Sequence, residues 1–350
     1  MVKIEDGIKL DFSDVLIKPK RSTLSSRKEV VLERTFKGLY SNTTWTGIPI
    51  MISNMDTTGT FQVARTASKY KILTILHKHY TIDDWNVFLT KEYYNILDTE
   101  WDYYGISTGI SDNDFEKTKQ IFKIIPNIKI LIVDVANGYT ELFIETIKKY
   151  RKEFPDKLIF AGNVVTAEMT EALILAGADG VKVGIGNGAV CTTRIQTGVG
   201  VPQLSAIMEC ADAAHGLNGL IISDGGNKNP GDFSKAFGAN TDFIMSGSTF
   251  AGTYESAGEL KEIGDKLYKE YYGMSSKVAM DKHAGGVAEY RSSEGKLVQI
   301  EYKGKLEDVI KDLLGGIRSA CTYTGSKTLK ELSKRCTFVL VHNQVNTLYC

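Results

Sequence analysis

One segment of the chain combines a candidate nucleophile with glycine and polar neighbours. Residues 180–206 read GVKVGIGNGAVCTTRIQTGVGVPQLSA, in which a β-branched strand runs into a glycine-rich loop that carries Cys191. A thiolate is a strong nucleophile, and its reactivity depends on a polar and accessible setting. Most free cysteines are instead small buried hydrophobes, and we expect that of the other four cysteines. Cys191 is therefore the candidate for covalent catalysis.

Other polar residues and glycines recur directly after short apolar segments. They read SNMD at 53–56, HKHY at 77–80, DVANG at 134–138, SDGG at 223–226 and SGS at 246–248. In a barrel of parallel strands the carboxyl ends of all strands meet at one mouth, where active sites form. Strand ends also adjoin loops, which are polar in any protein. The density of such groups nevertheless favours a binding site at this mouth.

Some of these positions suggest individual roles. Gly225-Gly226 and Gly247-Ser248 leave backbone amides open to phosphate oxygens, although either pair by itself also suits a simple turn. Asp224 would repel phosphate and is better suited to accept hydrogen bonds from ribose hydroxyls. Lys78 and Asp134 are expected at the same mouth. Lys78 is suited to bind an anionic cofactor or to transfer protons, whereas most lysines are only solvated.

Glu294 is the candidate acid–base group outside these strand ends. It lies between serine and glycine in SSEGK, within a long segment after the last strand. A carboxylate on a lid can orient a leaving group or act as a general acid–base, although most exposed glutamates only carry charge. His77 and His79 are two residues apart at the end of an expected strand, and we do not expect them to bind one metal.

Alternating apolar runs and helical segments predict the elements that position these residues. Strands followed in order by amphipathic helices indicate a single-domain (β/α)8 TIM barrel, with an open doubly wound sheet as the alternative. The expected strands are Ile48–Met55, Ile72–His77, Trp101–Ser107, Ile130–Ala136, Leu158–Asn163, Val181–Ile185, Leu220–Ser223 and Phe243–Ser246. Residues 1–47 would form an amino-terminal arm, 252–304 a lid or flap after the eighth strand, and 341–350 a carboxyl-terminal tail.

The amino-acid composition limits which binding partners and which cellular compartment we expect for the protein. The 350 residues include 42 basic and 42 acidic side chains, and this balance makes nucleic acid an improbable main partner. Five cysteines without metal-binding spacing suggest a reducing compartment. No segment suggests a signal peptide or a membrane span, so we expect a cytoplasmic protein without a membrane partner.

Several motifs together resemble one family. They are SNMDTTGTF, HKHY, DVANGY, GIGNGAVCTTRIQTGVGVPQLSA, SDGG, YGMSS, GGVAEYRSSEGK and GGIRSACTYTG, and they cover nearly the whole chain in order. In this order they are similar to the GMP reductases, a branch of the superfamily that includes IMP dehydrogenase. The dehydrogenases usually carry an insert between the second and third strands, and too few residues separate those strands here.

The resemblance implies reductive deamination of GMP to IMP and ammonia with NADPH, in purine nucleotide interconversion and salvage. Cys191 would attack C2 of the purine and form a covalent thioimidate. Thr193 and Glu294 would transfer protons and activate the departing amine, while Lys78 and Asp134 would lie close to the nicotinamide. The family is typically a homotetramer whose cofactor sites are completed by a neighbouring subunit.

The resemblance also implies three sets of binding residues. GMP would contact Asp224, Gly225, Gly226, Gly247, Ser248, Gly273, Met274, Ser275, Arg291, Ser292, Ser293, Glu294 and Gly295. NADPH would contact Ser26, Arg27, Lys78, Asp134, Val135, Ala136, Ile185, Gly186, Tyr290, Arg291, Ser319, Ala320, Cys321 and Thr322. A potassium ion would bind carbonyl oxygens of Gly186, Gly188 and Cys191, with Arg194 nearby.

The nucleophile loop departs from the family pattern. The family usually has glycine-proline-glycine-serine before the cysteine, where this chain has Asn187 and Ala189 in place of proline and serine. The missing serine hydroxyl removes a hydrogen bond to phosphate. Ser248, in place of a usual glycine, and Lys228 are expected to redistribute phosphate binding.

Two other functions are compatible with these motifs. One is an IMP dehydrogenase-like oxidation through the same thioimidate. The other is a nucleotide-binding barrel that senses or scaffolds without catalysis, which the altered loop favours. Retention of Cys191, Thr193 and Glu294 together argues against the second function.

Overall fold

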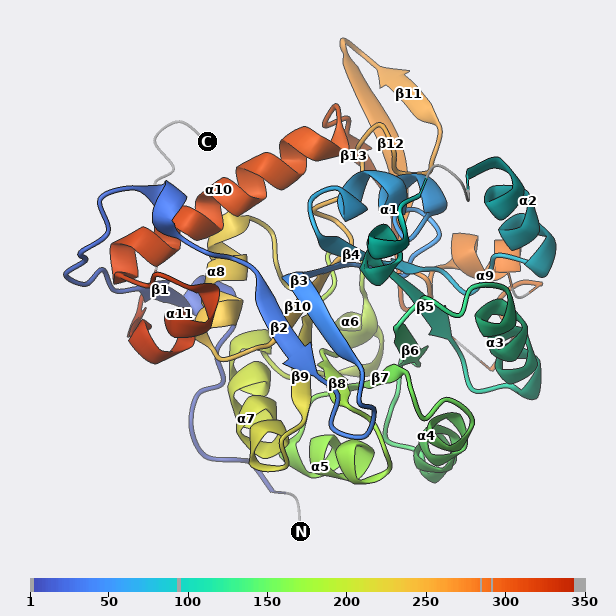
Figure 1. Cartoon of the computed structure of the whole chain (residues 1–350), viewed down its shortest axis with the longest axis horizontal. Helices are drawn as coiled ribbons and strands as arrows, with labels where there is room; N and C mark the ends of the chain where they lie inside the picture. Colours follow the sequence, from blue (N-terminus) through green and yellow to red (C-terminus); the bar gives the residue numbers. More distant parts are fainter. Residues whose placement is uncertain (1–2, 93–95, 284, 291, 343–350) are drawn as a thin grey trace.

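A closed barrel of parallel strands forms the centre of the computed structural model, which describes residues 3–92, 96–283, 285–290 and 292–342 (Figure 1). Neighbouring strands follow the chain order, and the last strand pairs with the first, because Ile244 lies opposite Ile50. The barrel strands are β3 (Thr44–Ile52), β4 (Ile72–Leu76), β5 (Tyr104–Thr108), β6 (Ile130–Asp134), β7 (Leu158–Val164), β8 (Gly180–Val183), β9 (Leu220–Asp224) and β10 (Phe243–Ser246). The predicted (β/α)8 barrel is confirmed, and the open sheet is excluded.

Two predicted strands begin three or more residues from the observed start, and another begins one residue away, at Gly180 rather than Val181. The first strand begins at Thr44 rather than Ile48 and ends at Ile52. The third begins at Tyr104, because Asp98–Tyr103 form a 3-10 helix, η4. Trp101 of η4 is fully buried against Tyr104, so the apolar run reflected packing rather than strand structure.

A layer of helices surrounds the barrel (Figure 1). In α4 the Thr140 side chain caps the first turn, and Phe143, Ile147 and Tyr150 recur on the face that is buried against the strands. The surrounding helices are α1 (Phe61–Ser68), α2 (Ile82–Glu92), α3 (Asp112–Ile124), α4 (Glu141–Glu153), α5 (Ala167–Leu175), α7 (Gln203–Gly216), α8 (Pro230–Gly238) and α10 (Leu306–Thr324). None of the described helices has the length and apolar character needed to cross a membrane.

The barrel interior is a packed apolar core. Met51, Ile75, Ile132, Phe160 and Phe243 are all fully buried in one cluster. Because large side chains fill the interior, ligands have access only at the mouth, where the polar strand ends lie.

The amino-terminal arm is an ordered cover for the barrel rather than a free extension. It contains η1 (Phe12–Asp14), β1 (Val15–Ile17), η2 (Arg27–Glu29) and β2 (Arg34–Lys37). β1 pairs with the carboxyl-terminal strand β14 (Phe338–Leu340), which follows α11 (Leu329–Arg335), and β2 pairs antiparallel with β3. The two ends of the chain are thereby joined on one side of the barrel.

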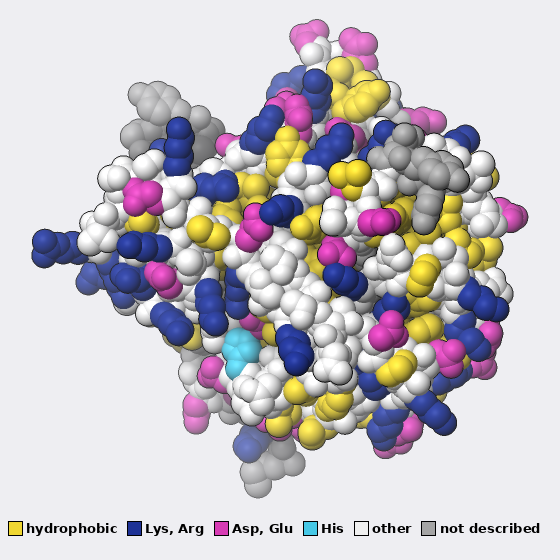
Figure 2. All heavy atoms as spheres, in the orientation of Figure 1, with side chains coloured by type: hydrophobic (Ala, Val, Ile, Leu, Met, Phe, Trp, Pro, Cys, Tyr) yellow, Lys and Arg dark blue, Asp and Glu magenta, His cyan; other side chains and the backbone are white. Residues whose placement is uncertain are grey.

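The expected lid is largely regular structure. It contains β11 (Leu260–Ile263), β12 (Lys266–Tyr272), α9 (Lys277–His283) and β13 (Leu297–Glu301). The three strands form an antiparallel sheet, and the β11–β12 hairpin projects from the body (Figure 1). On the face shown in Figure 2, acidic and basic side chains are interspersed, apart from a group of basic side chains at the left edge.

Candidate active site

Three side chains from two distant segments form a hydrogen-bonded chain at the barrel mouth. The Cys191 thiol donates to Thr193 Oγ1 over 3.2 Å, and the Thr193 hydroxyl donates to Glu294 Oε2 over 2.6 Å. Thr193 is the first residue of the short helix α6 (Thr193–Thr197), and Glu294 precedes β13. This chain offers a proton path from the nucleophile to a carboxylate.

Backbone pairing brings the lid segment to the nucleophile loop. Thr192 N donates to the Glu294 carbonyl over 2.9 Å, and Lys296 N donates to the Val190 carbonyl over 2.9 Å. Gly295 lies between these contacts and bridges both Cys191 and Ser276. A Cβ atom on Gly295 would lie 2.9 Å from Ser276 N, so the close approach requires glycine.

A cavity at the barrel mouth, here called the first cavity, is lined by Cys191, Thr193 and Glu294 and has a volume of about 230 Å³. Most of the predicted nucleotide-binding residues line it, which places the glycine amides of two strand ends beside the thiol. The residues in the lining are Cys191, Thr193, Asp224, Gly225, Gly226, Gly247, Ser248, Gly273, Met274, Ser275 and Glu294, together with the predicted cofactor residues Ile185 and Gly186.

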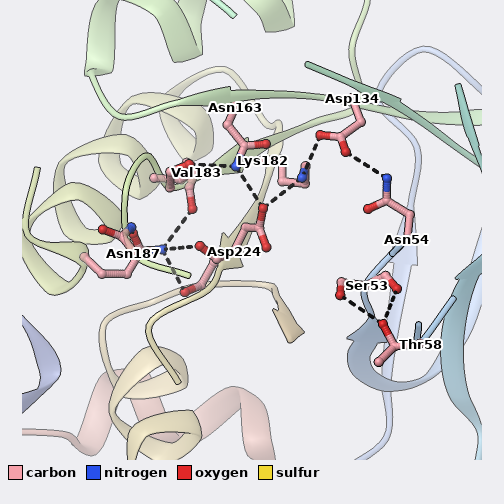
Figure 3. Close-up of polar contacts among 12 residues, drawn as sticks. Ser53, Asn54, Thr58, Asp134, Asn163, Lys182, Val183, Asn187 and Asp224 are labelled. Atoms are coloured by element: carbon pink, nitrogen blue, oxygen red, sulfur yellow. Dashed lines mark hydrogen bonds and ion pairs between the residues drawn. The ribbon is translucent and has the colours of Figure 1, made fainter. Parts of the chain in front are cut away.

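A buried lysine that the sequence analysis missed connects two predicted site residues (Figure 3). Lys182 Nζ lies 2.8 Å from Asp134 Oδ1 and 2.8 Å from Asp224 Oδ2. Burial lowers the pKa of this lysine, but the two carboxylates outweigh burial and hold the pKa above its usual value. A lysine inside the strand motif GVKVG was the available signal, because such a residue is buried only with partners.

Two asparagines complete this network (Figure 3). Asn54 Nδ2 donates to Asp134 Oδ2 over 2.8 Å, and Asn163 Nδ2 donates to Asp224 Oδ2 over 2.8 Å. Burial raises the pKa of Asp134, but Lys182 and Asn54 outweigh burial and keep the pKa below its usual value. Asp224 Oδ1 accepts no hydrogen bond from the described residues, so this oxygen is available to a ligand.

A second cavity, of about 960 Å³, adjoins the first. Predicted cofactor residues Lys78, Asp134, Val135 and Ala136 line it. The two cavities share a wall that consists of Asp134, Ala136, Asn163, Lys182, Met274 and Ser275. Two ligands could therefore meet beside Cys191.

The chain matches known proteins over almost its whole length. A profile described as the IMP dehydrogenase / GMP reductase domain matches residues 9–346. The chain belongs to this family. It is 56% identical to the GMP reductase of Onchocerca volvulus, over 100% of this chain and 95% of that protein. It is 54% identical to GMP reductase 1 of Homo sapiens, over 100% of both chains, and to the GMP reductase of Enterobacter sp. (strain 638), over 99% of both.

Some residues predicted from the IMP dehydrogenase / GMP reductase family lie away from both cavities. Ser26 and Arg27 start η2, which packs against α10, the helix that contains residues 319–322. The Cys321 thiol is buried, and burial raises its pKa to about 12, so this side chain is not accessible to a cofactor in the isolated subunit.

The lid residues of this family are only partly in the site. Ser292 and Ser293 do not line the first cavity, and the Ser293 hydroxyl instead donates to the Gly295 carbonyl over 3.1 Å. Tyr290 is 94% exposed. Arg291 and residues 343–350 of the predicted tail lie outside the described part of the chain.

The family-atypical Asn187 has a structural role in the nucleophile loop. Its side chain donates to Gln203 Oε1 and accepts from Arg194, which also lies 3.2 Å from Asp11. Gln203 is fully buried and donates to the Val183 carbonyl over 2.9 Å. These bonds connect the loop to the end of β8 and restrict its conformation, which is the role that a proline has through its fixed φ.

The expected phosphate contact of Lys228 is not supported by its position. Lys228 is exposed and does not line the first cavity, whereas the preceding Asn227 is buried in the cavity wall. The Asp232 carboxylate accepts the Lys228 amide hydrogen over 3.0 Å, and this bond holds the Lys228 backbone in the turn before α8. Ser248 and Ala189 do line the cavity.

The histidines near the mouth stack on other rings. His77 stacks on Tyr80 and His79 stacks on His283, with ring centroids 3.9 Å and 3.7 Å apart. Burial lowers the pKa of both His77 and His79 to about 4. No group of three or more histidine, cysteine or acidic residues that could hold a metal occurs among the described residues.

Proposed function

We propose that the chain is a GMP reductase that converts GMP to IMP and ammonia with NADPH. The observation that carries this proposal is the hydrogen-bonded sequence Cys191–Thr193–Glu294 in a cavity that adjoins a second, larger one. A nucleophile with an acid–base relay suits displacement of an amine from a purine. The adjoining cavity suits a second, reducing ligand.

The residues of the chain perform two half-reactions. The Cys191 thiol gives its proton through Thr193 to Glu294, and the thiolate attacks C2 of the purine. The C2–N bond then breaks, and Glu294 returns a proton to the amine, which leaves as ammonia. The product of this half-reaction is a thioimidate on Cys191. NADPH, when bound, supplies a hydride to C2, after which the C2–S bond breaks and thiolate and IMP are released.

The first cavity is assigned to GMP. Asp224 would accept hydrogen bonds from the ribose, and amides of Gly225, Gly226 and Gly247 with the Ser248 hydroxyl would hold the phosphate. Gly273, Met274 and Ser275 would contact the nucleotide from the lid side. Residues 252–304, which include 291–295, would act as the lid. A lid excludes water, so the thioimidate is reduced rather than hydrolysed.

The second cavity is assigned to NADPH. Its volume suits a dinucleotide half, and Lys78, Asp134 and Ala136 carry the charge and backbone groups to hold it. We assign contacts with the cofactor of a neighbouring subunit in a homotetramer to residues outside both cavities of their own chain: Ser26, Arg27, Tyr290, Ser319, Ala320 and Thr322. The buried Cys321 side chain would not take part in these contacts.

The nucleophile loop also fits a potassium ion, through carbonyl oxygens of Gly186, Gly188 and Cys191. The Gly188 carbonyl accepts the Cys191 amide hydrogen over 3.0 Å and retains a second lone pair. Asp11 balances the charge of the nearby Arg194, so the guanidinium does not oppose a cation. The ion would order the loop that carries the thiol. We place the enzyme in the cytoplasm, in purine interconversion and salvage.

The test is the loss of absorbance at about 340 nm when purified protein is mixed with NADPH and GMP, with chromatography of the products. We expect IMP and ammonia to appear in equal amounts, and no turnover by Cys191→Ala. Turnover of IMP with NAD⁺ instead would indicate the dehydrogenase reaction. Nucleotide binding without turnover in either direction would contradict the enzymatic proposal.

A further inference from the structure

We propose that Lys117, together with Lys78 and His79, forms a phosphate-binding subsite in the second cavity. The ligand class is a phosphate group of a dinucleotide, either the pyrophosphate bridge or a phosphate on the ribose. The proposal rests on the proposed function, because that function assigns the second cavity to a dinucleotide. Lys117 has no role in the chemistry described above.

The cavity wall brings several cations together from separate elements. Lys78 and His79 follow β4, Lys117 lies on α3, and Lys282 and His283 end α9. The carboxylates in the same wall are Asp114 and Asp134, and the buried Lys182 also reaches it.

Most of these charges are already paired. Lys182 forms an ion pair with Asp134. Lys282 and His283 both contact the buried carboxylate of Asp56, at 2.9 Å and 2.7 Å. Lys78 Nζ is 3.7 Å from Asp114 Oδ2, which is a long ion pair. Lys78 and Lys117 therefore share this part of the wall with one carboxylate, Asp114, whose Oδ2 also accepts a hydrogen bond from Ser111 over 2.8 Å.

Among the described lysines of this cavity wall, Lys117 is the one that forms no ion pair with a described carboxylate. Its ammonium donates to the backbone carbonyl of Lys78. The two lysines are therefore neighbours in the cavity wall. Burial lowers the pKa of Lys117, Asp114 raises it, and the nearby Lys78 lowers it further. A bound phosphate would compensate both effects that oppose the charged form.

His79 supplies a neutral donor to the same place. Burial, His283 and Lys78 lower its pKa to about 4, so the ring is uncharged at neutral pH and can donate one N–H. Two ammonium groups and a neutral N–H match the charge and the acceptors of a phosphate.

The test measures equilibrium binding rather than turnover. NADPH and NADH are titrated into the full-length protein that carries Cys191→Ala, with and without Lys117→Gln, and protein fluorescence is followed. The glutamine can keep the bond to the Lys78 carbonyl but removes the charge. Lys119→Gln is the matched control, because Lys119 lies on the same helix and pairs with Glu116 and Glu153 outside the cavity.

We expect Lys117→Gln to weaken NADPH binding about tenfold, Lys117→Arg to restore most of the affinity, and Lys119→Gln to have little effect. Equal weakening of NADPH and NADH assigns the subsite to the pyrophosphate, and weakening of NADPH alone assigns it to the ribose phosphate. Inorganic pyrophosphate should compete with NADPH, and less well in Lys117→Gln.

Unchanged affinities for both dinucleotides in Lys117→Gln would overturn the subsite. That result would leave the proposed function intact if the wild-type protein still reduces GMP. If the protein fails to turn over GMP but pyrophosphate still binds through Lys117, the proposed function is wrong and the subsite stands.

Discussion

Thr193 Oγ1 donates a hydrogen bond of 2.6 Å to Glu294 Oε2, although 101 positions separate the two residues. The bond closes the path from the Cys191 thiol to a carboxylate that lies on another segment of the chain. Because one hydroxyl carries one proton and two lone pairs, Thr193 donates to Glu294 and accepts from the thiol at the same time, but it cannot donate to both. The two residues should therefore act as a unit.

Glu294→Gln should lower kcat about a hundredfold to ten-thousandfold, because an amide cannot take the proton. Thr193→Val should lower kcat in the same range, and the double variant should be little worse than either single variant. Steady-state kinetics with GMP and NADPH measure this. Glu301→Gln, at an exposed position of β13, is the control. A kcat of Glu294→Gln within about twofold of wild type would contradict the relay.

Lys182→Met should destabilise the protein by about 3–5 kcal/mol, because it leaves the partly buried carboxylates of Asp134 and Asp224 without their shared, buried cation. Urea unfolding measures the change. Lys129→Met is the control, since Lys129 is partly exposed and has one carboxylate partner, Asp102, so the expected cost is at most about 1 kcal/mol. Equal effects of both substitutions would show that the central network does not stabilise the barrel mouth.

Ser248 and Ala189 both line the first cavity, and Ser248→Gly should weaken GMP binding about tenfold if, as we propose, its hydroxyl replaces the phosphate contact that Ala189 cannot make. Adding Ala189→Ser should restore the affinity. Lys228→Ala should have no effect, because Lys228 lies outside the cavity. Calorimetry with GMP measures all three, and binding of guanosine, which lacks the phosphate, should not respond to any of them. A response of guanosine equal to that of GMP would argue against a phosphate contact.

His215→Gln should lower stability more at low pH than at high pH. His215 Nε2 lies 2.8 Å from Asp242 Oδ2, and this hydrogen bond raises the pKa of His215 above 6.5. A raised pKa stabilises the fold fully below the unfolded pKa, and this stabilisation is lost as the pH rises through the folded pKa. Urea midpoints should differ from wild type by about 1 kcal/mol near pH 5.5 and by less near pH 9. A larger difference at the higher pH would reverse the assigned sign.

The sequence alone determined the barrel and the position of the candidate nucleophile within it. Buried strands and amphipathic helices depend on local periodicity, and β10 was predicted with its observed ends, Phe243–Ser246. Polar strand ends such as Asp224 and Gly225 must meet at one mouth once the strands are parallel. Cys191 was recognisable because its neighbours are glycine and small polar residues. Each of these inferences needs only residues close together in the chain.

Only the tertiary structure decided which of these side chains are partners. Lys182 lies between Asp134 and Asp224 because β6, β8 and β9 end at one level of the barrel, and local pattern carries no information on that register. The position of Lys228 outside the first cavity was not predictable from the sequence for a related reason. Its direction depends on the turn made by Asp232, not on its distance from Gly226 in the sequence. Long-range packing determines which side chains form hydrogen bonds or ion pairs with one another. Residue type can therefore indicate a functional group, but it does not indicate which residue lies beside it.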